Sequence, residues 1–234
     1  LTEVESKRIL EAYGIPVNRT EIALSEDEAV HLAEKMGYPL VMKVHSLDIS
    51  HKSDADGVQL DLRSESHVRE AYEKILKGAE SYDPKAEVQG VTLQPMFLRP
   101  DFEILMGAKK DPNFGPVILF GTGGTLAEVV GDRALGLPPM NRLLARRLME
   151  ETRIYPLLKG YRNKPEADRQ LLEEMIIRLS QLVTDFPQIS ELDMNPVIVK
   201  DGKPVAVDAR IKVEPIDTDG PHHLAISLYP ADQE

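Results

Sequence analysis

A lysine at the end of an apolar run, followed by a polar loop that carries a histidine, is the feature with the clearest chemical potential. Residues 39–44 have the pattern of a buried strand, and this strand delivers Lys43. An ammonium held there can neutralise phosphate oxygens in a cleft. The alternative, which is commoner for an arbitrary lysine, is a surface side chain that lies along an edge strand with its charge in water.

The loop after this strand contains His51 within the run His51-Lys52-Ser53-Asp54. An imidazole can accept a phosphoryl group on one ring nitrogen when the other nitrogen is held by a hydrogen-bond acceptor. Asp54, three residues further on, is within plausible reach for that role. The plainer alternative is a loop histidine that bonds the backbone. A strand lysine beside such a loop suggests phosphate chemistry.

Asn195 and Asp208 flank a second candidate feature, a hairpin predicted from the turn residues Asp201 and Gly202. An amide oxygen and a carboxylate on the two sides of a hairpin can face the same point. Magnesium bound to nucleotide phosphates needs only one or two protein oxygen ligands. The alternative is that Asn195 makes a turn with the next proline and Asp208 forms an ordinary ion pair with Arg210, and the residues alone leave both open.

The segment Gly121-Thr122-Gly123-Gly124 allows backbone N–H groups to approach a phosphate. It lacks the Lys-Ser/Thr ending of a P-loop, so it is not that motif. A tight turn between two strands is an equal alternative.

These residues must be positioned by helices and strands that are mixed from end to end, and the extended runs favour antiparallel sheet. The first helix is predicted from a capping-box pattern of Thr2 and Glu5, and the strongest one, 164–185, carries an apolar stripe that should pack on a sheet. Further helices are predicted over 25–36, 65–79 and 141–151, and strands over 39–44, 58–62, 87–95, 102–107, 117–120, 191–199 and 204–211.

Composition limits the class of protein. The 234 residues include 42% hydrophobic and 29% charged residues, enough for one large core or two small ones. A net charge of -11 disfavours nucleic-acid backbone binding, and the lack of cysteine excludes disulfides and thiolate metal sites. With neither a long apolar run nor a signal pattern at the N-terminus, we expect a cytoplasmic protein without membrane contact. The missing initial methionine suggests a fragment or a processed chain.

Several ordered motifs together resemble the ATP-grasp domain of ADP-forming acyl-CoA synthetases over about residues 1–213. The motifs are 38–44, 50–54, 120–124, 191–196 and 207–210. The resemblance implies an α+β ATP-grasp fold with two α/β lobes that clamp a nucleotide. The expected organisation is an N-terminal lobe of residues 1–95, a C-terminal lobe of 96–213, and a connector or tail of 214–234.

The resemblance also implies roles for single residues. ATP or ADP with Mg2+ would be the cofactors, Asn195 and Asp208 the metal ligands, and Glu191 a weaker candidate. His51 would carry a phosphoryl group between the nucleotide and a histidine of a CoA-binding partner domain. The nucleotide would contact Lys43, the hinge residues Gln94, Pro95, Met96 and Phe97, and Glu103.

The segments 132–141, 158–162 and 222–230 look more like bacterial fusions in which such a domain precedes a protein-lysine acetyltransferase domain. Two functions therefore remain open. The first is a catalytic module of an acid-CoA ligase that is incomplete without its partner domain. The second is a nucleotide- or acyl-CoA-sensing module of a fused acetyltransferase. A carboxylate-amine ligase, a third possibility, needs no histidine carrier.

Overall fold

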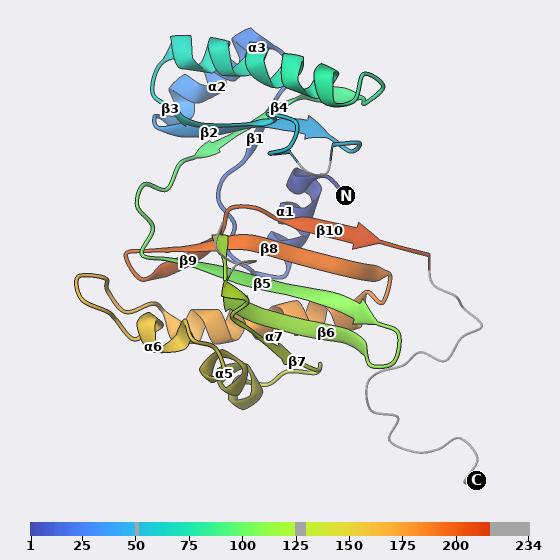
Figure 1. Ribbon diagram of the computed structural model, residues 1–234, viewed down its shortest axis with the longest axis vertical. Helices are drawn as coiled ribbons and strands as arrows, with labels where there is room; N and C mark the ends of the chain where they lie inside the picture. Colours follow the sequence, from blue (N-terminus) through green and yellow to red (C-terminus); the bar gives the residue numbers. More distant parts are fainter. Residues whose placement is uncertain (50–51, 125–129, 216–234) are drawn as a thin grey trace. The chain divides into compact units, whose positions relative to one another are not determined.

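The computed structural model describes residues 1–49, 52–124 and 130–215, and the chain divides into two compact units (Figure 1). Unit 1 consists of residues 3–17 and the chain from Arg99 onward, and unit 2 of Asn18–Leu98, with the two terminal residues divided between them. These units differ from the lobes expected at 1–95 and 96–213, because residues 3–17 pack with unit 1.

Unit 2 is a four-stranded antiparallel sheet in the order β1-β4-β2-β3, with two helices over one face (Figure 1). Both helices begin at a serine that accepts a backbone N–H, Ser25 for α2 and Ser64 for α3. The elements are β1 (Glu21–Ala23), α2 (Glu26–Met36), β2 (Leu40–Ser46), β3 (Val58–Leu62), α3 (Glu65–Tyr82) and β4 (Val88–Pro95).

The core of unit 2 lies between this sheet and its helices. Alternate residues of β2, namely Leu40, Met42 and Val44, face α2 and α3. The residues between them, including Lys43, therefore belong to the opposite face of the sheet.

Unit 1 contains a six-stranded antiparallel sheet in the order β10-β8-β5-β6-β7, with β9 also paired to β8. Its core contains the predicted apolar stripe of α7 (Arg169–Asp185), which packs on β5 and β6. The other elements are α1 (Glu3–Ala12), β5 (Phe102–Asp111), β6 (Gly115–Thr122), β7 (Arg133–Gly136), α5 (Arg142–Glu150), α6 (Tyr155–Leu158), β8 (Ile189–Lys200), β9 (Lys203–Ala206) and β10 (Arg210–Val213).

Most predicted elements are confirmed, and the differences have local causes. The last helix begins at Arg169 and not at 164, because Asp168 caps it by accepting the Leu171 N–H. The predicted strand 204–211 is two strands, β9 and β10. The short elements β1, β7 and α6 were not predicted, because they have three or four residues and too little periodicity.

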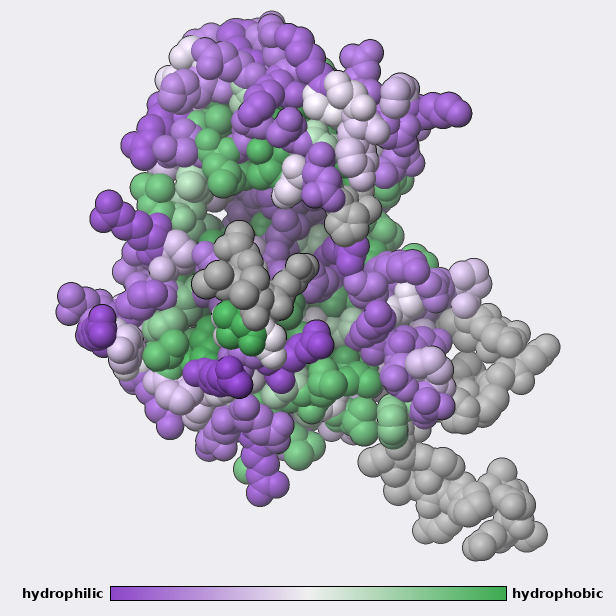
Figure 2. All heavy atoms as spheres, viewed as in Figure 1, coloured by the Kyte–Doolittle hydropathy of each residue, from purple (hydrophilic) through white to green (hydrophobic). Residues whose placement is uncertain are grey.

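Hydrophilic and apolar residues are distributed as expected for a folded chain with many charged residues. Hydrophilic residues cover most of the outer surface visible in Figure 2, and the large apolar side chains lie mainly in the two cores. No helix among the described residues is both long enough and apolar enough to cross a bilayer.

Candidate functional site

Lys43 lies in the middle of the unit 2 sheet. The strand that carries it, β2, pairs with β3 and β4, and Lys43 is opposite Val58 on one side and Thr92 on the other. The side chain is only 6% exposed. The edge-strand interpretation is therefore wrong, because this lysine belongs to an interior strand. The contact of Lys43 with nucleotide phosphates stays a prediction.

Gln94 belongs to the same face of this sheet. It follows Thr92 by two residues on β4, and it is 2% exposed. Its side-chain oxygen accepts a hydrogen bond of 2.7 Å from the Asn18 amide nitrogen. The remaining side-chain oxygen of Asn18 is buried and has no hydrogen-bond partner among the described residues. It is an acceptor that a ligand N–H can satisfy, and nothing in the sequence pattern indicated it.

The predicted hinge continues directly from β4. Pro95 ends the strand, and the Met96 N–H donates to the Pro39 carbonyl at 3.0 Å. Met96 and Phe97 are half-buried. These residues therefore lie next to Gln94 along the chain, at the border of unit 2, and their contact with a nucleotide remains a prediction.

His51 lies outside the described residues, but both flanks of its loop are fixed. Ile49 and Ala55 are 1% and 2% exposed and belong to the core of unit 2. The Gly57 N–H donates to the Lys52 carbonyl at 2.8 Å, which closes the C-terminal part of the loop. Gly78 of α3 lies so close that a Cβ there would be 2.5 Å from the Ala55 carbonyl oxygen. The loop base is thus tightly packed.

In unit 1, Asn195 lies on β8 where the pairing with β5 is irregular. The register shifts between Ile104 and Met106, so the β8 residues opposite this point leave the regular ladder. The Asn195 side-chain oxygen accepts a 2.8 Å hydrogen bond from the Gly124 N–H. Asn195 is therefore fixed by the glycine-rich segment, which explains its place better than a simple turn does.

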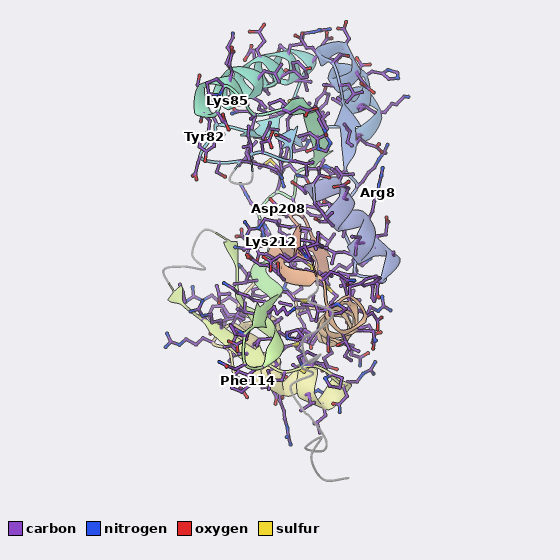
Figure 3. The ribbon with its side chains drawn as sticks, turned by 90° about the vertical axis from the view of Figure 1, so that its right-hand side faces the viewer. Arg8, Tyr82, Lys85, Phe114, Asp208 and Lys212 are labelled. Carbon is purple, nitrogen blue, oxygen red and sulfur yellow. The ribbon has the colours of Figure 1, made fainter. Side chains whose placement is uncertain are left out.

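The strand register brings Asp208 opposite Asn195. Val197 pairs with Ala206 of β9, and Asp193 pairs with Arg210 of β10, so both short strands keep one register along β8. They behave as a single strand that is interrupted at residues 207–209. Counting through the interruption places Asp208 across from Asn195, and Asp208 lies on this connection in Figure 3.

The glycine-rich segment and Glu103 complete this group in unit 1. The Gly123 N–H donates to the Glu103 carbonyl at 2.8 Å. Gly124 has a φ of 72°, and an added Cβ would overlap the Glu103 carboxylate. Glycine adopts this positive φ without strain and leaves room for the Glu103 side chain. Glu103, Gly124 and Asn195 therefore lie close together, and the predicted roles of Glu103 with the nucleotide and of Asn195 with the metal stay predictions.

Asp132 is a supporting residue that the sequence analysis did not single out. Its buried carboxylate accepts hydrogen bonds from the Thr122 hydroxyl at 2.6 Å and from the N–H groups of Arg153 and Ile154 at 2.7 and 3.0 Å. It ties the glycine-rich segment to the turn before α6. A single aspartate before a short strand gives no sequence signal for such a role.

Acidic side chains gather around β8 near Asn195 and Asp208. Burial raises the pKa of Asp193; the Arg210 charge opposes this rise, while Asp208 and Glu191 add to it. Arg210 donates to Glu191 at 2.5 Å, so Glu191 is a salt-bridge partner. Among the described residues, no three acidic or histidine side chains are close enough to hold a metal by themselves. The donors therefore fit Mg2+ that takes its other ligands from phosphate and water.

The fold and these groups define an ATP-grasp class of protein, an α+β fold of two units with a buried lysine in one unit and two side-chain oxygen donors placed opposite each other in the other. A family profile described as ATP-grasp domain matches residues 1–213. The chain belongs to the ATP-grasp domain family.

Several of the similar proteins are CoA ligases. The chain is 37% and 40% identical to the beta subunits of ADP-forming acetate–CoA ligases I and II of Pyrococcus furiosus, covering 90% of this chain and 90% of each subunit. It is 43% identical to the ADP-forming 4-hydroxybutyrate–CoA ligase of Nitrosopumilus maritimus, over 85% of this chain but only 28% of that protein.

Solved structures agree. An acetyl-CoA synthetase of Candidatus Korarchaeum cryptofilum, in complex with coenzyme A and Ca-AMPCP, superimposes with a TM-score of 0.86 at 36% identity, covering 92% of this chain and 93% of that chain. Another structure of that enzyme, with a TM-score of 0.77 and 33% identity over 92% of each chain, contains coenzyme A and Mg-AMPPCP. The predicted resemblance and fold class are thereby confirmed.

Proposed function

We propose that this chain is the nucleotide-binding module of an ADP-forming acyl-CoA synthetase, which binds ATP or ADP with Mg2+. The observation that carries the proposal is the register of β8 with β9 and β10. It sets Asn195 opposite Asp208, beside the glycine-rich segment whose Gly124 N–H donates to the Asn195 side-chain oxygen. The match to 90% of the length of two beta subunits of acetate–CoA ligases supports the same activity.

Different residues bind the phosphates, the rest of the nucleotide and the metal. Lys43 neutralises phosphate oxygens from an interior strand, and the hinge residues Gln94 to Phe97 bind the nucleotide next to Asn18, whose side-chain oxygen accepts a ligand N–H. Glu103 contacts the nucleotide from unit 1. Asn195 and Asp208 hold the metal, which neutralises charge on the phosphates when it is bound.

His51 relays the phosphoryl group in this proposal. One ring nitrogen attacks the γ-phosphorus of ATP, an N–P bond forms, and the bond from that phosphorus to the bridging oxygen of the β-phosphate breaks, which releases ADP. The reverse step makes ATP. A histidine of a CoA-binding partner domain or subunit exchanges the phosphoryl group with His51. The described residues on the two sides of His51, Ile49 and Ala55, are buried in the core of unit 2.

The proposals of a CoA-binding partner and of a fused acetyltransferase domain rest on different observations. A CoA-binding partner is consistent with the name "subunit beta" of two relatives and with the much greater length of the Nitrosopumilus maritimus ligase. A fused acetyltransferase domain rests only on the sequence resemblance of 132–141, 158–162 and 222–230. The comparisons give no support to the purely regulatory alternative.

Isothermal titration of the chain with Mg-ATP and Mg-ADP tests the proposal. We expect saturable binding by the wild type, loss of nucleotide affinity in Lys43→Ala, and loss of the magnesium-dependent part in Asp208→Ala. Lys85→Ala is a control on an exposed residue of unit 2. A folded wild-type chain that binds neither nucleotide would overturn the proposal.

A second measurement addresses the relay. After incubation with γ-labelled ATP, the chain should hold acid-labile and base-stable phosphate, as a phosphohistidine does. His51→Asn should abolish the label and retain nucleotide binding. Equal labelling of this variant would exclude His51 as the carrier.

A further inference from the structure

The helix α1 buries a polar stripe where a helix of this kind usually buries an apolar one. Glu3, Ser6 and Lys7 lie on one face and are 6%, 0% and 3% exposed. Leu10 continues the same face into the core of unit 1. Buried ion pairs add little net stability, because the desolvation penalty offsets their attraction. A buried lysine and glutamate in a surface helix therefore require another explanation.

The polar stripe contacts one short segment of the sheet. The Ser6 hydroxyl oxygen accepts the Ile211 N–H at 3.1 Å. The Lys7 ammonium donates to the Glu3 carboxylate at 2.8 Å and to the Val207 carbonyl at 3.0 Å. All of these contacts with the sheet lie between residues 207 and 211, where β9 has ended and β10 begins.

This segment is the interruption that presents Asp208. Residues 207–209 lie outside both strands, so their peptide groups need partners other than a regular ladder. The Val207 N–H donates to the Pro196 carbonyl at 3.2 Å, and its carbonyl accepts from Lys7. The two peptide groups that flank Val207 are thus held from different sides: the 206–207 peptide by β8, and the 207–208 peptide, which leads into Asp208, by Lys7 of α1.

We propose that Lys7, paired with Glu3, is a positioning residue of the metal site: it fixes the 207–208 peptide so that the Asp208 carboxylate stays opposite Asn195. The inference rests on the proposed function of Asp208. Glu3 neutralises the lysine charge, so the pair acts through geometry and has little net field at the metal. Outer residues that orient metal ligands commonly change metal affinity by about 10- to 100-fold.

The test compares the magnesium dependence of ADP binding in four proteins. They are the wild type, the variant Glu3→Gln with Lys7→Met, the variant Asp208→Ala, and the combination of all three changes. Replacing both members of the pair avoids leaving a lone buried charge, which could unfold the chain. Circular dichroism and thermal unfolding confirm the fold of each variant. The exposed pair Glu73 and Lys77 has the same spacing on α3, so Glu73→Gln with Lys77→Met is a matched control.

We expect the double variant to raise the Mg2+ concentration for half-maximal ADP binding by about tenfold, with little change in binding measured without the metal. In the Asp208→Ala background the same double change should have no further effect, because both act on one ligand. A purely structural role would lower the melting temperature and leave the Mg2+ midpoint unchanged, which would overturn the inference. An Asp208→Ala variant with wild-type magnesium dependence would overturn the proposed metal site itself, and the inference with it.

Discussion

The two units position the residues that we propose to bind the nucleotide and the metal in different ways. In unit 2, Lys43 and Gln94 lie within an unbroken stretch of the β2–β4 ladder, from Leu40 to His45 on β2. In unit 1, Asn195 and Asp208 lie where the backbone leaves its ladder, at a register shift and at a strand interruption. In this chain the lysine lies on a regular strand, whereas the two oxygen donors lie on irregular backbone that is stabilised by contacts with other residues.

The largest expected effect comes from adding a side chain at Gly123, whose backbone lies directly against β5 beside the proposed metal site. In Gly123→Ala, the new Cβ would overlap the backbone of Ile104 and Leu105, which cannot rotate away. We expect a loss of about 3 kcal/mol in the free energy of unfolding and loss of magnesium-dependent nucleotide binding. Urea denaturation and calorimetric titration measure the two effects.

Gly131→Ala is the control for this change. Gly131 has a φ of 58° but no atom within 4 Å of an added Cβ, so its cost should be only the conformational one, about 1 kcal/mol. Equal losses in the two variants would show that backbone overlap does not maintain the site.

Gly78→Ala applies the same change to unit 2, with a smaller expected effect. Alanine favours a helix by about 1 kcal/mol over glycine. The added Cβ would nevertheless lie 2.5 Å from the Ala55 carbonyl oxygen, at the base of the His51 loop. We expect a net loss of about 1 kcal/mol, reduced phosphohistidine formation, and unchanged ADP affinity. Normal labelling with γ-labelled ATP would mean that this packing does not serve the relay.

The smallest expected effect is on the pH dependence of stability and comes from Asp193 on β8. The pKa of Asp193 is raised chiefly by burial, so the folded state binds its proton more tightly than the unfolded state. The resulting stability is present at acid pH and is lost as the pH rises through the raised pKa. Asp193→Asn removes this titration. The variant should therefore be more stable than the wild type near neutrality, and this advantage should shrink near pH ~4.

Thermal unfolding of both proteins across this pH range measures the difference. Arg210 opposes the raised pKa, and Asp208 and Glu191 reinforce it, so all of these charges must stay unchanged in the comparison. An Asn variant with the same pH profile as the wild type would show that Asp193 titrates normally.

The contrast between regular strands and irregular backbone also explains which features could be predicted from the sequence. The strand at 58–62 and the helix at 25–36 were predicted because their signals are local. The hairpin turn was predicted for the same reason, and Asp201 and Gly202 have the positive φ values of 50° and 79° that it requires. Lys43 was found as a strand lysine, although its interior position became clear only from the pairing of β2.

The remainder of the site depends on contacts between distant residues. The run from 204 to 211 has the pattern of one strand, and nothing in it indicates the break at 207–209. The partner of that break is Lys7, separated from Val207 by 200 positions. The roles of Asp132 and Asn18 depend in the same way on neighbours that no local pattern reveals.

The division of the chain has a consequence for synthesis on the ribosome. Unit 2 is complete once Leu98 has emerged, so it can fold early, whereas α1 must wait for β10 before it finds its place. During this interval the exposed face of α1 carries Glu3, Ser6 and Lys7, which water solvates well. An exposed apolar stripe would make the nascent chain prone to aggregation, whereas the polar residues of this face lower that risk until β10 has been synthesised.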